Sequence, residues 1–163
     1  MGIAIHDGTC IINGGDIRDN NFSGISIGSG GFLILNNGSI RNNISPINGG
    51  GVVISTGGRF TMSGGTITGN RSPTVGGVVV LQTESSRFDM SGGTISGNMA
   101  NQAGGGVCIA HGAVFNQSGG NINNNNASQA GGGILVLSGG RYNQTGGSVN
   151  TNSAPVGGNI FRE

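Results

Sequence analysis

The stretch GVVISTGGRFTMSGGTITGNRSPTVG, residues Gly51–Gly76, is one copy of a repeat that recurs along the chain of 163 residues. The next copies begin at Gly77, Gly106 and Gly133, so the period is 26 to 29 residues. Two divergent copies begin at Gly2 and Gly24, and a partial copy begins at Gly158. A period of this length indicates a repeat architecture, in which each unit packs against its neighbours.

Each copy is expected to contain three short β-strands. In the copy at Gly51, apolar and other residues alternate over residues 52–54, 60–62 and 66–68. Such alternation is typical of strands, and the Gly-Gly pairs between the runs allow the positive φ that tight turns require. No window has the apolar spacing of a helix. The sequence therefore predicts one all-β domain over residues 1–163, a parallel β-solenoid (β-helix) of about six coils with three strands each.

Aligning the copies brings similar residues into columns that repeat once per coil. One column is expected to point inward and contains Ile17, Ile40, Ile67, Ile95, Ile122 and Val149. Three residues after each of these comes an asparagine, which gives the column Asn20, Asn43, Asn70, Asn98, Asn125 and Asn152. Stacked amides bond to one another along the stacking direction, so a hydrogen-bonded asparagine ladder is predicted at a corner of the coil.

Two further sets of inward columns follow from the same alignment. The first strand supplies Ile3, Ile25, Val52, Val78, Val107 and Ile134, then Ile5, Ile27, Ile54, Val80, Ile109 and Val136. The second strand supplies Cys10, Leu33, Phe60, Phe88, Phe115 and Tyr142, then Ile12, Leu35, Met62, Met90, Gln117 and Gln144. The two glutamines interrupt an apolar column. Either they stack as a pair of amides, or the last coils pack less tightly.

Two surfaces are candidates for self-association. The outward positions of the first strand carry an apolar stripe, which predicts a lateral interface unless a loop or a flanking segment covers it. Its members are Val53, Val79, Leu81, Leu135 and Leu137. The two ends of a solenoid expose unpaired strand edges. Another copy stacked end to end would cover them through Ile3, Ile5, Ile160 and Phe161, unless the chain is a piece of a longer array.

Composition excludes several classes of partner. The net charge is +1 and only 8% of the residues are charged, which gives no electrostatic footprint for nucleic acid or for an anionic membrane. No apolar run is long enough to span a bilayer, and residues 1–10 show no secretory signal. Cys10 and Cys108 lie four coils apart, roughly 19 Å, which is too far for a disulfide. Cys10 is expected in the core and Cys108 as a surface thiol.

The search for catalytic chemistry gives no candidate. The chain has no metal-ligand, P-loop or calcium-repeat motif, and no cofactor is expected. His6 and His111 lie four coils apart and do not share a metal site. Glu84 and Asp89 share a coil, but the simpler interpretation is that Asp89 balances a surface arginine. We therefore expect no catalytic residue, no metal site and no enzyme activity.

The repeat GGGV-x-x-x-x-GG-x-F-x-M-SGGTI-[ST]-GN resembles those of right-handed parallel β-helices in bacterial surface proteins. It is similar to adhesin and autotransporter-passenger repeats of the pectin-lyase-like superfamily. The resemblance implies right-handed coils and an extracellular or cell-surface location. No catalytic residue of the superfamily's enzymes falls on a matching position.

Three functions remain open at this stage. The first is a structural or adhesive surface protein or self-assembling filament subunit, whose partners are other copies of itself, glycans or a host surface. The second is an ice- or carbohydrate-binding module, and the third is an enzyme acting on polysaccharide. A flat threonine array would favour ice binding, but the columns that hold Thr66 and Thr68 also hold charged residues and asparagines.

Overall fold

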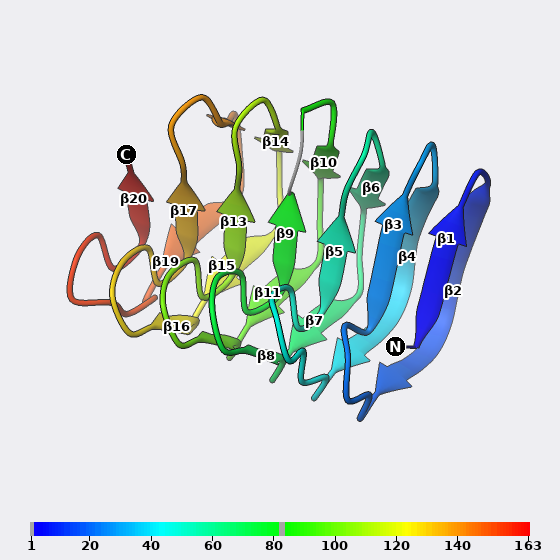
Figure 1. The fold of residues 1–163 in the computed structure, drawn as a ribbon, viewed down its shortest axis with the longest axis horizontal. Coiled ribbons are helices and arrows are strands. Elements are labelled where there is room, and N and C mark those ends of the chain that lie inside the picture. Colours follow the sequence, from blue (N-terminus) through cyan, green and yellow to red (C-terminus); the bar gives the residue numbers. More distant parts are fainter. Residues whose placement is uncertain (1, 82–83) are drawn as a thin grey trace.

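The computed structural model describes residues 2–81 and 84–163, with the backbone alone for residues 79–81. The described chain is an all-β parallel solenoid, which confirms the predicted fold class. Figure 1 shows the coils side by side, with residues near the N-terminus at one end and those near the C-terminus at the other. Each coil hydrogen-bonds to the next along the long axis, so the core runs from one end to the other.

The first sheet contains one strand from every coil. Its strands pair in parallel in the order β1 (Ile3–His6), β3 (Ile25–Gly28), β5 (Val52–Ile54), β9 (Val79–Leu81), β13 (Val107–Ile109), β17 (Ile134–Val136) and β20 (Ile160–Arg162). These strands lie in front in Figure 1, and all point in the same direction.

The second sheet begins with two long strands and then divides. β2 (Thr9–Arg18) pairs with β4 (Phe32–Arg41). One half of β4 continues to β6 (Arg59–Met62), β10 (Arg87–Met90), β14 (Val114–Gln117) and β18 (Arg141–Gln144). The other half continues to β7 (Thr66–Thr68), β11 (Thr94–Ser96), β15 (Asn121–Asn123) and β19 (Ser148–Asn150). The second and third predicted strands are therefore one continuous strand in the first two coils.

The division of the sheet has a local cause at the Ser-Gly-Gly turns. A Cβ placed on Gly64 would lie 2.2 Å from the backbone oxygen of Asn36 in the previous coil, so only glycine fits there. Gly65 follows with a φ of 75°, which turns the chain out of the strand.

A short third sheet adds a strand that the repeat pattern did not predict. It contains β8 (Arg71–Ser72), β12 (Met99–Ala100) and β16 (Asn126–Ala127), each of which follows an asparagine of the predicted ladder. The middle coils therefore have four strands rather than three. Two residues give too little alternation to be recognised as a strand.

The predicted phenylalanine column forms a stack inside the coil. The rings of Phe60, Phe88 and Phe115 lie 4.5–4.6 Å apart and nearly parallel, and Tyr142 continues the stack at 5.2 Å. The Tyr142 hydroxyl donates a hydrogen bond of 2.6 Å to Oε1 of Gln117, which is buried. Gln117 therefore satisfies the polar end of the tyrosine. The side-chain amide of Gln144 instead donates to the carbonyl of Gly147.

The predicted register of the first sheet is wrong in one coil. Val79 pairs with Val52 and with Val107, whereas the alignment placed Val78 there. In the same way, Leu81 rather than Val80 pairs with Ile54. The cause is that two glycines, not three, precede this apolar run, so Val78 occupies the position of the third glycine. Val78 is nevertheless buried.

Candidate functional site

The asparagine column lies at the corner between the second and third sheets. Each side-chain amide nitrogen donates to the side-chain oxygen of the next asparagine, at 2.8–3.1 Å from Asn20 through Asn43, Asn70, Asn98 and Asn125 to Asn152. Asn152 donates in turn to Asn159, at 3.2 Å, so Asn159 takes the place of a seventh rung. The repeat alignment did not predict this role, because Asn159 stands in the glycine column at the start of a coil.

The ladder amides have no capacity left for a ligand. Besides the next rung, the Asn98 side-chain nitrogen donates to the carbonyl of Ile67 in the previous coil, at 3.0 Å. Its oxygen accepts from both the backbone and the side chain of Asn70. The side chains of Asn43, Asn70, Asn98 and Asn125 are buried, and no buried polar side-chain atom of the described residues lacks a partner. The ladder therefore holds the coils together.

The residue before each rung turns the backbone through the left-handed region. The φ angles at these positions lie between 52° and 67°, at Asp19, Asn42, Gly69, Gly97, Asn124 and Thr151. Glycine, asparagine and aspartate adopt this conformation at the least cost, which explains the composition of most of the column. The sharp bend makes the corner concave.

A groove of about 450 Å³ follows this concave corner across the middle coils. One bank carries the turn residues Asn42, Gly69, Gly97 and Asn124, and the other carries Ile44, Arg71, Met99 and Asn126, with Asn98 between them. A second hollow, of about 350 Å³, adjoins the groove. It is lined by Ile44, Ser45, Pro46, Arg71, Ser72, Pro73 and Asn101. Arg71 and Ile44 belong to both spaces.

Arg71 differs from most of the other arginines in its surroundings. Arg41 and Arg18 lie beside Asp16, Arg87 lies 2.6 Å from Asp89, and Arg162 lies over the ring of Tyr142. No ion pair within residues 2–81 and 84–163 includes Arg59, Arg71 or Arg141. Of these three exposed arginines, Arg71 is the one that lines the groove and the hollow.

The predicted lateral stripe is wrong at Leu135. Its side chain is only 2% exposed and packs with Cys108, which is also buried rather than the expected surface thiol. Val75 and Ala103, from the segments that follow the third sheet, cover them together with Leu137 and Phe161. Those segments form a bridged row of their own, from Val75 through Ala103 and Ala130 to Val156. Burial raises the pKa of the Cys108 thiol to about 12, so the thiol is unreactive at neutral pH.

The remaining stripe residues do not make a continuous exposed surface. Val53 and Leu137 are half-buried. The register pairs Val79 and Leu81 with the inward residues Val52 and Ile54, so their predicted place in the stripe is also wrong, and their side chains lie outside the described residues. An interface on this face would therefore have to use the covering segments rather than the sheet itself.

The residues predicted for end-to-end contact lie on the outermost strands of the first sheet. β1 carries Ile3, which is half-buried, and Ile5, which is buried. β20 carries Ile160, which packs against the main core, and Phe161, which packs against Leu135 on the outer face. Within the described chain, each of these two strands has a neighbour on one side only.

The titratable side chains do not converge on one place. Asp16 accepts hydrogen bonds from Arg41 and Ser39, and these lower its pKa to about 2. Burial raises the pKa of Asp89, but hydrogen bonds from Arg87 and Asn116 outweigh it and the net shift is downward. His111 Nε2 lies 3.9 Å from Glu84 on the surface. Among the described residues, no group of three or more His, Cys, Asp or Glu side chains is placed to hold a metal ion.

A scan against protein families matches residues 2–149 to the model described as "Right handed beta helix region". The chain belongs to this family. The match covers most of the chain, and membership of this family means that the coils are right-handed. No curated protein and no solved structure matches it.

No helix among residues 2–81 and 84–163 has the length and apolar character needed to cross a membrane.

The corner groove was not predicted, although its lining was visible in the sequence as the residues on either side of each ladder asparagine. The repeat pattern does not show that this corner is concave, because the concave shape depends on how the backbone bends there.

Proposed function

We propose that the protein is a non-catalytic structural β-solenoid of an extracellular or cell-surface location, which adheres or assembles by stacking end to end. The observation that carries the proposal is that the repeated polar side chains form hydrogen bonds and ion pairs within the chain itself. The ladder amides are consumed by coil-to-coil hydrogen bonds, and Asp16 and Asp89 are paired with arginines of their own surface. The location follows from the resemblance to surface repeats.

The outermost strands of the first sheet support stacking. Within the described residues, β1 and β20 each have backbone groups without a neighbouring strand on one side, and edges of this kind pair with other chains unless charge or proline blocks them. β1 carries no Lys, Arg, Asp or Glu, and β20 carries one charged residue, Arg162, which lies over the ring of Tyr142. Contact between unlike ends does not close on itself, so it produces filaments.

Negative-stain microscopy and light scattering on the purified chain test stacking. Rods are expected with an axial repeat of roughly 30 Å, which is six to seven coils at about 4.8 Å each. Ile3→Lys places a charge on the edge strand and is expected to shorten the rods, whereas Ile47→Lys, at an exposed loop site away from both edge strands, serves as the matched charge control. Monodisperse monomers at high concentration would contradict the assembly.

A separate assay addresses catalysis. Incubation with a panel of polysaccharides is expected to release neither reducing ends nor unsaturated products. Release that persists through purification would make the protein an enzyme, and a thermal hysteresis signal would favour ice binding instead.

A further inference from the structure

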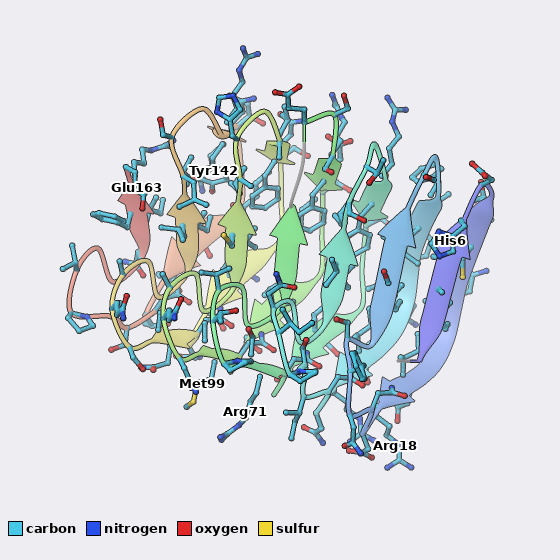
Figure 2. The ribbon with its side chains drawn as sticks, in the orientation of Figure 1. His6, Arg18, Arg71, Met99, Tyr142 and Glu163 are labelled. Carbon is cyan, nitrogen blue, oxygen red and sulfur yellow. The ribbon has the colours of Figure 1, made fainter. Side chains whose placement is uncertain are left out.

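Arg71 is a cation placed where a ligand can reach it. It is exposed, it lines both the corner groove and the adjoining hollow, and no acidic side chain of the described residues pairs with it. Figure 2 shows Arg71 and Met99 projecting from the same side of the solenoid. A guanidinium presents a planar fork of donors that matches a carboxylate with two parallel hydrogen bonds.

The neighbours of Arg71 along the axis are apolar. Ile44 precedes it by one coil and is 54% exposed, and Met99 follows it by one coil. Apolar walls on both sides limit the water that competes for the guanidinium, which strengthens a charged hydrogen bond. The hollow beside Arg71 continues this apolar character with Pro46 and Pro73. This lining suits an aliphatic group attached close to the carboxylate.

The groove on the other side of Arg71 suits a short extended chain. From Arg71 to Asn126 it crosses three coils, which is two coil spacings or about 10 Å. An extended peptide advances about 3.4 Å per residue, so three residues fill this length. The exposed amides of Asn124 and Asn126 can each donate to and accept from a peptide group. Gly97 has no side chain, which leaves the bank beside Met99 open.

We propose that the corner groove binds the C-terminal end of an extended peptide. The terminal carboxylate pairs with Arg71, the aliphatic side chain of the last residue fills the hollow against Pro46 and Pro73, and the preceding peptide groups bond to Asn124 and Asn126. A peptide is favoured over a glycan because no aromatic ring lines either space to stack on a sugar. The site does not depend on end-to-end stacking, since no residue of β1 or β20 contributes to it.

The test is a nuclear magnetic resonance titration of the full chain labelled with ¹⁵N. The probe is an acetylated pentapeptide of four alanines followed by leucine, with a free terminal carboxylate. The same peptide with an amidated C-terminus is the control. We expect shifts confined to the groove and hollow, including the amides of Ile44, Arg71 and Met99. We expect the amidated peptide to bind about tenfold more weakly, the effect of one charged hydrogen-bonded contact at a partly exposed site.

Variants separate the site from a general charge effect. Arg71→Gln is expected to weaken binding of the free peptide about tenfold and to abolish the difference between the two peptides. Arg71→Lys, which keeps the charge but not the fork, should recover part of the loss. Arg141→Gln removes the same charge from a different face and should change nothing. Unchanged circular dichroism shows that each variant is folded.

Three results would overturn the proposal. The first is an absence of shifts in the groove with either peptide. The second is equal affinity of the free and amidated peptides for the unmodified chain. The third is displacement of the shifts by a uronic-acid tetrasaccharide that binds more tightly than the peptide, which would make the site a glycan site. None of these results bears on stacking, which is read from rod formation.

Discussion

The first coil and the coil that begins at Gly77 use the same columns in different surroundings. Asn98 has a coil on each side and is 1% exposed, whereas Asn20 has a neighbour on one side only and is half-buried. Asn98 accepts two hydrogen bonds from the previous coil and donates to the next one. Asn20 donates onward to Asn43 and to the carbonyl of Arg18.

The same contrast holds at the glycines. A Cβ on Gly64 would collide with the backbone of the coil before it, but a Cβ on Gly14 would meet nothing within 4 Å. Surface charge differs as well, because the first coil carries the Asp16 cluster. The comparison shows that a residue type at a repeat position does not make a fixed contribution to the stability of the fold. Its contribution depends on whether both neighbouring coils are present.

The largest effect is expected at the ladder. Asn98→Ala removes the acceptor for two donors of Asn70 and leaves the Ile67 carbonyl short of a partner, all in a buried corner. It should lower the free energy of unfolding by about 3 kcal/mol or more. Asn20→Ala, in the same column of the first coil, should cost less than about 1 kcal/mol. Urea unfolding followed by circular dichroism measures both. Equal losses would contradict the dependence on neighbours.

A smaller contrast is expected at the turns of the second sheet. Gly64→Ala forces its methyl group against the Asn36 backbone oxygen and should cost about 2 kcal/mol as the coils separate locally. Gly14→Ala has open space and should be neutral or slightly stabilising, since alanine restricts the unfolded chain. Thermal melting of the two variants side by side provides the measurement. A lower melting temperature for Gly14→Ala would contradict the open space around Gly14 in the first coil.

The repeat pattern was sufficient to predict the register where a column depends only on the two neighbouring coils. The phenylalanine stack pairs Phe60, Phe88 and Phe115 in the expected register, because one ring position per coil leaves one arrangement. The register at Val79 was missed because the apolar run was aligned from its first valine. Counting the preceding glycines would have corrected it, since Gly76 and Gly77 align with Gly49 and Gly50.

Features that depend on the path of a loop were not predictable in this way. Leu135 alternates like an exposed residue, yet the segments that follow the third sheet fold over it. The covering residues Val75 and Ala103 belong to a column that recurs once per coil, directly before a Gly-Gly pair, and continues through Ala130 to Val156. One apolar residue per coil marks this column, but it does not show that the segment lies over Leu135. The groove around Arg71 is a similar case, because its two banks come from the residues on either side of each ladder asparagine, to which the alignment gave no role.

The smallest effect, and one that follows pH, is expected from the Asp16 cluster in the first coil. Hydrogen bonds from Arg41 and Ser39 lower the pKa of Asp16 from an ordinary 3.8 to about 2. The folded state therefore favours the carboxylate, and the stability it contributes is fully present above pH 4 and is lost as the pH falls through about 2. Because the cluster is exposed and screened by salt, the loss should be at most about 2 °C in melting temperature.

Asp16→Asn should remove that part of the decline between pH 4 and pH 2. The remaining decline belongs to other carboxylates, including Asp89, whose pKa is also lowered in the folded chain. If Asp16→Asn and the unmodified chain lose stability in parallel down to pH 2, the cluster contributes nothing to the first coil. The contact between the first and second coils would then rest on the pairing of β1 with β3 and of β2 with β4, on the hydrogen bond from Asn20 to Asn43 and on the apolar core.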